Sequence, residues 1–303
     1  MSESKDFFKG SMVAIATPMN KDETIDFDSL ESLIEFHIAN KTDVIVSVGT
    51  TGESATLDFD EHKNVIKNTL EIVNKRIPVI AGTGANSTSE AIELTKSAKE
   101  LKADAVLLVT PYYNKPTQTG LYEHYIKIAD SVDIPQILYN VPGRTSVDML
   151  PDTVYKLSKH TNIIGIKEAS GDVERSQELL EKCSENISIF TGDDKTSMRD
   201  LLLGFKGNIS VTANIAPSQM HVMCKNAIEG KKDIADKINQ KLDILHDALF
   251  LESNPIPVKW ALNNLGLISD GIRLPLTWLD EKYHVVLSDA LEKSEVKKEN
   301  ISV

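Results

Sequence analysis

The stretch "NIIGIKEASGD", residues 162–172, joins an apolar run to a lysine and then to a polar turn. The run reads as a buried strand, and Lys167 stands at its end. Burying an ammonium group is costly, so either the strand reaches water at Lys167 or the amine has a chemical use. The runs that surround this stretch decide the fold, and the fold decides between the two interpretations.

Eight short apolar and β-branched runs recur along the chain, and each passes into polar or turn-forming residues, mostly Gly, Thr, Asn, Asp or Pro. Continuous apolar runs of this length are typical of parallel strands buried on both faces. Amphipathic segments at 27–40 and 60–75 predict helices between them, and "NSTSEA" (86–91) and "SGDVERS" (170–176) offer helix starts. The eight runs are 12–19, 43–53, 77–84, 104–114, 135–143, 162–170, 187–194 and 208–214.

Alternating strands and helices predict parallel pairing through right-handed crossovers, and eight strands predict a closed (β/α)8 TIM barrel. The alternative is an open doubly wound sheet, which a G-x-G-x-x-G after the first strand would favour; the sequence has none there. Three more helices are predicted at 231–250, 255–265 and 280–293. We therefore expect a barrel catalytic domain over 1–230 and a C-terminal helical subdomain over 231–303.

The composition indicates which kinds of partner and which cellular compartment to expect. The net charge is −12, which argues against nucleic acid and anionic membranes. Two distant cysteines suit reduced thiols, the N-terminus lacks a secretion signal, and no apolar run approaches the roughly 20 residues that cross a bilayer. We expect a soluble cytoplasmic protein.

In a TIM barrel the active site lies at the C-terminal ends of the strands. None of the seven histidines falls there, so we expect no metal and no cofactor. Asp193 and Asp194 together can chelate a hard cation, but a loop or capping role is the interpretation we favour. The sequence also has no G-x-x-x-x-G-K-[ST] phosphate loop and no G-x-S-x-G turn.

The remaining candidate is the lysine. Residues 163, 165 and 167 are expected on one face of the strand, and Gly165 is expected to leave room beside Lys167. A partly desolvated lysine has a lowered pKa, and its free amine attacks carbonyl groups. This predicts Schiff-base chemistry.

Hydroxyl groups at neighbouring strand ends fit the proton transfers of such chemistry. Tyr139 ends the fifth run, and Thr50 and Thr51 follow the second. Alone, Tyr139 indicates core packing and "GTTGE" (49–53) a turn. With the lysine they indicate a relay, and the turn offers backbone N–H groups to a carboxylate. Arg144, otherwise a surface residue, can clamp a second carboxylate.

Six motifs carry a resemblance that runs from about residue 10 to 290. Together they resemble the dihydrodipicolinate synthase family of pyruvate-dependent class I aldolases, which also includes N-acetylneuraminate lyases. The motifs are "SVGTTGESATL", "AGTGANST", "TPYYNKPTQTGLYEHY", "ILYNVPGRT", "NIIGIKEASGD" and "NPIPVKWAL".

The resemblance implies a role for each catalytic residue. Lys167 would form the Schiff base with pyruvate, and Tyr139 would donate and accept protons through Thr50 and Tyr113. The family's equivalent of Tyr113 reaches in from a neighbouring subunit. The resemblance thus implies a homo-oligomer, a tetramer built as a dimer of dimers.

It also implies how two substrates would be held. Thr51 and the backbone of Ile209 would bind pyruvate, Arg144 would bind the carboxylate of L-aspartate 4-semialdehyde, and Gly192 would shape the pocket. The implied product is 4-hydroxy-tetrahydrodipicolinate, on the route to diaminopimelate and lysine.

Many members are inhibited by lysine at a dimer-interface site, and the matching positions imply sensitivity here. Phe59 is a departure, because relatives often carry histidine at that position. The matching positions are Ser54, Ala55, His62, Asn86, Glu90 and Tyr112.

Two alternatives stay open. A sister aldolase acting on N-acetylneuraminate or a keto-deoxy sugar acid would share the barrel, Lys167 and Tyr139, but such enzymes usually lack an arginine at the position of Arg144. A catalytically dead relative with a binding role is disfavoured because the reactive residues are all present.

Overall fold

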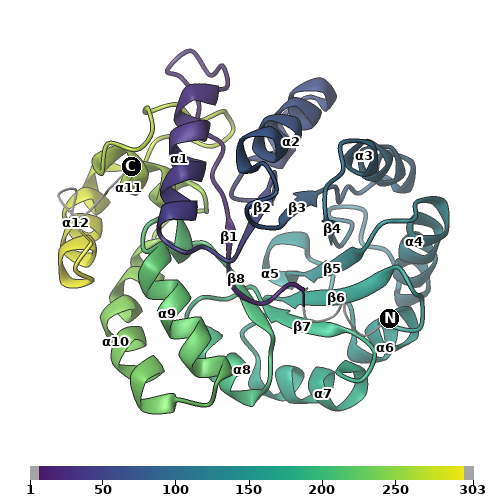
Figure 1. Ribbon diagram of the computed structural model, residues 1–303. Helices are drawn as coiled ribbons and strands as arrows, with labels where there is room; N and C mark the ends of the chain where they lie inside the picture. Colours follow the sequence, from purple (N-terminus) through teal and green to yellow (C-terminus); the bar gives the residue numbers. More distant parts are fainter. Residues whose placement is uncertain (1–6, 297–303) are drawn as a thin grey trace.

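The computed structural model describes residues 7–296. Its centre is a parallel barrel of eight strands in chain order, closed by pairing of the last strand with the first (Figure 1). This confirms the predicted TIM barrel and excludes the open doubly wound sheet. The strands are Gly10–Ala14 (β1), Val44–Ser47 (β2), Val79–Gly82 (β3), Ala105–Val109 (β4), Gln136–Asn140 (β5), Ile163–Glu168 (β6), Ser188–Thr191 (β7) and Gly207–Ser210 (β8).

Helices surround the barrel, and most connect consecutive strands (Figure 1). They are Phe27–Ala39 (α1), Phe59–Val73 (α2), Thr88–Glu100 (α3), Gln118–Ser131 (α4), Pro142–Thr145 (α5), Pro151–Leu157 (α6), Val173–Cys183 (α7), Ser197–Leu203 (α8) and Pro217–Ile228 (α9). Two short 3-10 turns, Ser54–Thr56 (η1) and Thr212–Asn214 (η2), follow β2 and β8.

The three helices predicted after the barrel are present. They are Lys232–Ala248 (α10), Ile256–Asn264 (α11) and His284–Lys293 (α12), the last preceded by a 3-10 turn, Glu281–Tyr283 (η3). α10 packs against α8 and α9, while α11 contacts η2 at the end of β8. α10 therefore packs against the part of the barrel that is last in sequence. The division at residues 230 and 231 stays a prediction.

The strands separate two apolar layers, as in other TIM barrels. One layer fills the barrel interior, and the other lies between the strands and the surrounding helices. Tyr139 and its register partner Lys167 are on the interior side. The interior residues include Met12, Val44, Val46, Ile80, Ala105, Leu107, Ile137, Tyr139, Ile164, Phe190 and Ile209.

β6 departs from the regular alternation that its sequence suggests. Its register against β5 shifts, because Gln136 pairs with Ile163 and Ile137 pairs with Gly165, which leaves Ile164 as an additional residue. Ile163 packs in the outer layer and Ile164 in the interior. The prediction that 163, 165 and 167 share one face was therefore wrong at 163, because a β-bulge changes the phase of the strand.

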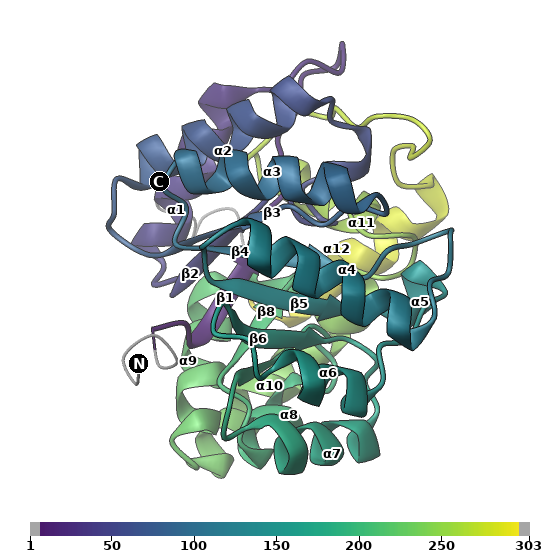
Figure 2. The ribbon, with the colours of Figure 1, turned by 90° about the vertical axis from the view of Figure 1, so that its right-hand side faces the viewer.

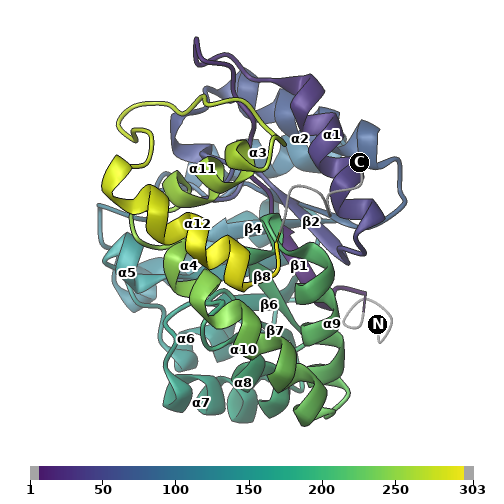
Figure 3. The same cartoon turned by 90° about the vertical axis from the view of Figure 1, so that its left-hand side faces the viewer.

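The C-terminal ends of the strands meet on one side of the barrel. Figures 2 and 3 show α5 and the connection between α11 and α12 on this side, and the N-terminal end of the described chain on the opposite side. The predicted helix start at 170–176 is also present, since Asp172 accepts hydrogen bonds from the N–H groups of Glu174 and Arg175. Within residues 7–296, no helix combines the length and the apolar character that crossing a membrane requires.

Candidate active site

Lys167 and Tyr139 lie side by side in the barrel interior. They are register partners on β6 and β5, so their side chains leave the sheet on the same face. The amine nitrogen of Lys167 is 4.3 Å from the centre of the Tyr139 ring. Only 5% of Lys167 and 7% of Tyr139 is exposed. Lys167 is therefore buried, and the interpretation that the strand simply reaches water at this residue is wrong.

Burial changes the chemistry of this amine. Loss of solvation lowers the pKa of Lys167 from 10.5 to about 7; the negative charge of Asp194 opposes this effect and the positive charge of Arg144 adds to it. Near neutral pH about half of the amine is therefore uncharged. An uncharged lysine amine is a nucleophile toward carbonyl carbons.

Glycine makes room for the lysine, but at a different position from the one predicted. A Cβ at Gly165 would lie 2.7 Å from the Phe190 ring, so that space serves Phe190. A Cβ at Gly192 would lie 2.4 Å from Cε of Lys167 and 3.0 Å from its Cγ. Gly192, after β7, is the residue whose missing side chain lets Lys167 extend along the barrel wall.

Tyr139 is held in its protonated form. Burial raises the pKa of its phenol, whereas the Arg144 charge and hydrogen bonding to Thr50 lower it and the Glu168 charge raises it. A phenol with a raised pKa can donate its proton at neutral pH and take it back later. The structure thus brings Thr50, Tyr139 and Lys167 together, as the sequence predicts.

A cavity of about 530 Å³ opens above these side chains. Thr51, Arg144 and Gly192 line it, together with Lys167 and Tyr139. The C-terminal segment closes one side with residues that the sequence analysis did not assign to the site; they are Phe250, Ser253 and Asn254.

Asn254 is buried and contacts the β2 loop directly. Its side-chain nitrogen donates to the hydroxyl of Thr51 over 2.9 Å, so that hydroxyl is free to donate its own proton into the cavity. From the sequence, this part of the chain was assigned only to the predicted helix at 255–265 and to the family motif "NPIPVKWAL". Its signal was the polar pair Ser253–Asn254 in front of a proline-rich apolar helix.

Two predicted residues lie apart from this group. The side chain of Tyr113 is 89% exposed on a residue with φ of 72°, and it lines none of the cavities described here. Ile209 is buried in the barrel interior, and Val211, which follows the end of β8, lines the cavity instead. A single chain therefore does not complete the Tyr139–Thr50–Tyr113 series.

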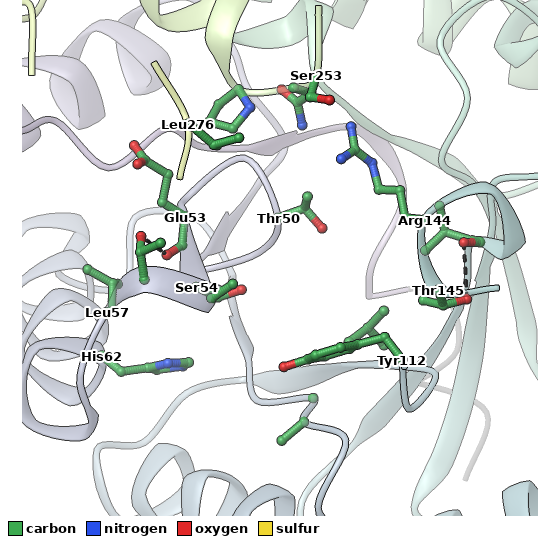
Figure 4. Close-up of a pocket in the computed structure, with 18 of the residues that line it drawn as sticks. Thr50, Glu53, Ser54, Leu57, His62, Tyr112, Arg144, Thr145, Ser253 and Leu276 are labelled. Atoms are coloured by element: carbon green, nitrogen blue, oxygen red, sulfur yellow. Dashed lines mark hydrogen bonds between the residues drawn. The ribbon is translucent and has the colours of Figure 1, made fainter. Parts of the chain in front are cut away.

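A second cavity of about 390 Å³ adjoins the first and shares Thr50 and Arg144 with it. Figure 4 shows Ser54, Leu57 and His62 along one side of this cavity and Tyr112 and Arg144 along the other. Five of the six residues matched to the inhibitor site line it. They are Ser54, Ala55, His62, Glu90 and Tyr112.

The sixth, Asn86, supports the wall from behind: its side chain donates to the Tyr112 carbonyl over 3.4 Å. His62 is held by the Gly82 carbonyl at 2.7 Å, and burial lowers its pKa despite that bond. Phe59 also lines the cavity and contacts the Lys63 amine through its ring face. This position therefore offers the cavity an aromatic ring and no hydrogen-bonding side chain.

Asp193 and Asp194 both accept hydrogen bonds from backbone N–H groups. Asp194 is buried and accepts from the N–H groups of Val211 and Thr212 and from the side chain of Asn208. Asp193 accepts from the N–H and hydroxyl of Thr196. Within residues 7–296 no three His, Cys, Asp or Glu side chains are grouped as a metal site would need.

A profile of the Dihydrodipicolinate synthetase family matches residues 7–294. The chain belongs to this family. The 4-hydroxy-tetrahydrodipicolinate synthase of Thioalkalivibrio sulfidiphilus (strain HL-EbGR7) is 60% identical over 284 residues, which cover 94% of this chain and 97% of the relative. The synthase of Pseudomonas aeruginosa PAO1 is 58% identical over 95% of this chain and 98% of its own. The resemblance inferred from the motifs is confirmed, and the chain is an enzyme of this family, a lyase.

Solved structures of the family share the fold. A chloride-inhibited dihydrodipicolinate synthase from Acinetobacter baumannii, complexed with pyruvate, has a TM-score of 0.94 at 56% identity and covers 95% of this chain and 99% of its own. A lysine-bound synthase from Cyanidioschyzon merolae has a TM-score of 0.93 at 36% identity, covering 96% and 99%. A monomeric synthase variant has a TM-score of 0.93 at 40% identity, covering 96% and 98%.

Proposed function

We propose that the chain condenses pyruvate with L-aspartate 4-semialdehyde, the reaction of a 4-hydroxy-tetrahydrodipicolinate synthase. The observation that carries the proposal is the buried amine of Lys167, with a pKa of about 7, beside the protonated phenol of Tyr139. The shared name of the relatives and the pyruvate complex of the Acinetobacter enzyme support the choice of substrates. This reaction would serve diaminopimelate and lysine biosynthesis.

The first half of the reaction takes place at Lys167. The uncharged amine attacks the ketone carbon of pyruvate, the ketone oxygen gains protons and leaves as water, and an imine remains. Loss of a proton from the methyl group then gives an enamine, whose carbon attacks the aldehyde of the second substrate. Tyr139 is placed to donate and recover the protons in these steps, because its phenol stays protonated at neutral pH.

The proton path would continue through Thr50 to Tyr113 of a second copy of the chain. An exposed aromatic side chain on a residue with positive φ is costly for a monomer to maintain, and burial against another copy would offset that cost. We therefore propose a homo-oligomer, arranged as a dimer of dimers, in which each active site uses two chains.

The carboxylates of the two substrates would bind to different residues. Pyruvate would take a hydrogen bond from Thr51, whose proton is free because Asn254 already donates to its oxygen. The Ile209 backbone and the space at Gly192 would complete that position. Arg144 lines both cavities and would pair with the carboxylate of the semialdehyde.

We propose that L-lysine inhibits the enzyme from the second cavity. Glu90 offers a carboxylate to an ammonium group, and Ser54 and Tyr112 offer hydroxyls. The lysine-bound Cyanidioschyzon structure supports this choice of ligand. Phe59 removes one hydrogen-bonding partner, so we expect weaker inhibition than in relatives with histidine there.

The experiment that tests the proposed function is reductive trapping. Incubation with pyruvate and borohydride should add one pyruvate-derived group to the chain, and peptide mapping should locate it on Lys167. Lys167→Ala should abolish the adduct and leave the fold intact. Trapping on any other lysine, or none in the wild-type chain, would refute the scheme. Turnover of the semialdehyde, measured beside cleavage of N-acetylneuraminate, separates the synthase from a sister aldolase.

Tyr113→Phe tests the shared site. It should slow turnover while leaving the oligomer intact by analytical ultracentrifugation, because it removes only the hydroxyl. A wild-type rate in this variant would remove Tyr113 from the proton path. The expected cytoplasmic location stays a prediction.

A further inference from the structure

A buried ion pair joins the loop after β2 to helix α11. The Lys259 amine donates to the carboxylate of Glu53, and the side chains of both are withdrawn from water, with exposed fractions of 0% and 1%. In none of the other ion pairs within residues 7–296 are both side chains buried to this degree. From the sequence, Lys259 was expected only to lie in a helix, although it stands in the apolar run "IPVKWAL".

Glu53 contacts the C-terminal segment with both carboxylate oxygens. One oxygen accepts from Lys259, and the other accepts from the N–H of Arg273 over 3.2 Å. Burial lowers the pKa of Lys259 while the Glu53 charge raises it. A buried charge that loses its partner is strongly destabilising, whereas apolar replacement of a whole buried pair often is not. The pair is thus a poor device for stability alone.

The backbone of Glu53 is coupled to the proposed catalytic hydroxyls. Its N–H donates to the Thr50 carbonyl over 3.1 Å, and the Ser54 N–H donates to the Gly49 carbonyl over 3.4 Å. The Thr17 hydroxyl donates to the Gly52 carbonyl over 2.8 Å. The turn is closed by its own hydrogen bonds, so the position of Glu53 is transmitted to Thr50.

The loop that holds Glu53 also carries Thr50 and Thr51 into the site. Figure 4 shows Glu53 and Thr50 as parts of one loop, with Thr50 reaching toward the middle of the cavity. Thr51, between them in sequence, is held by Asn254, which lies five residues before Lys259. The C-terminal segment therefore holds this loop at two adjacent points.

We propose that the Glu53–Lys259 pair is a positioning device for the reaction, fixing Thr50 and Thr51 relative to Tyr139 and Lys167. Lys259 lines neither of the two cavities; it acts through Glu53, so it is a positioning residue. This inference rests on the proposed function for the roles of the two threonines. It gives the C-terminal segment a part in the chemistry beyond packing.

The decisive variant is the double change Glu53→Gln with Lys259→Met. It keeps the side-chain volumes and leaves an oxygen for the Arg273 N–H, but it removes both charges and the tether. We expect a melting temperature close to that of the wild type, a kcat lowered about tenfold and a raised KM for pyruvate, because small displacements of catalytic groups are costly in rate. Wild-type kcat and KM in this variant would overturn the proposal.

Two further variants separate position from stability. Lys259→Met alone leaves the buried Glu53 carboxylate without a counter-charge, so it should lower both the melting temperature and kcat. Leu242→Ala, in the buried face of α10, should lower the melting temperature without changing kcat. If kcat fell in proportion to the melting temperature in both, general loosening would be the cause and the proposal would be wrong.

A readout that does not need turnover keeps the inference distinct from the proposed function. Amide hydrogen exchange in a peptide covering residues 49–56 should be faster in the double variant than in the wild type. Unchanged exchange there would refute the positioning role even in an active enzyme. A different outcome would separate the two proposals. If the wild-type chain formed no pyruvate adduct but the double variant still exchanged faster at residues 49–56, the proposed reaction would be refuted and the Glu53–Lys259 pair would still be shown to hold the loop.

Discussion

Gly192→Ala is the most direct test of how the barrel presents Lys167. The added Cβ would lie 2.4 Å from Cε of Lys167, 2.9 Å from Cβ of Ala169 and 3.0 Å from Cγ of Lys167. The backbone of Gly192 is outside the left-handed region, so alanine brings no conformational strain. The whole effect of the substitution is steric.

The size of the effect follows from these distances. Ordinary carbon contacts begin near 3.4 Å, so Cε must retreat by about 1 Å, and a displacement of this size can cost on the order of 100-fold in rate. Overpacking also costs about 1–3 kcal/mol of stability. Because β6 and β7 are paired on both sides, the side chain and not the backbone is expected to move.

The assay is the time course of pyruvate trapping at Lys167, followed by mass spectrometry, with kcat measured in parallel. We expect trapping to slow by roughly 100-fold while the fold stays intact by circular dichroism. Gly120→Ala is the control, because its Cβ would meet only the Pro116 and Thr117 side chains at 3.2 and 3.6 Å. A wild-type trapping rate in Gly192→Ala would show that Lys167 does not depend on this space, and the steric argument would fail.

Two further results are expected from the pKa of Lys167. The trapping rate should rise with pH and reach half of its maximum near pH 7, because only the free amine reacts; a rise that continues to pH 10 would mean that the reacting lysine is solvated. Lys167→Met should stabilise the fold by about 5 kcal/mol at most below pH 7, since the wild-type folded state must bury the protonated amine there. Between pH 7 and 10.5 only the unfolded chain keeps the proton, so the wild type gains stability as pH rises and the benefit of the variant should fade. Urea unfolding at pH 6.5 and 9.5 measures the difference, and an equal gain at both values would contradict it.

Much of the fold was predictable because the signals are local. Eight runs of buried residues separated by helical periodicity left few topologies, and the helices after the barrel begin within one to four residues of their predicted starts. Which residues of a strand face the interior, and which face the helices, was not predictable in the same way. Ile164 is one more apolar residue in an apolar run, so no pattern in the sequence marks the bulge.

Some residues of the site were likewise predictable from the sequence and others were not. Lys167, Tyr139 and Thr50 were predictable because each follows or ends a strand and parallel strands bring their ends together. Asn254 and Lys259 were not, because they belong to a segment that returns to the barrel after all eight strands are complete. The role proposed for Tyr113 requires a second copy of the chain.

The bulge in β6 has a consequence for inheritance and for protein engineering. A deletion of the single codon for Ile164 would restore strict two-residue alternation and keep every ladder partner available to the strand. Lys167 would keep Tyr139 as its partner and its place on the interior face, because Gly165 would then follow the outward-facing Ile163 in regular alternation. The extra residue thus lets the start of β6 lose one position while the reactive amine stays on its own side of the barrel.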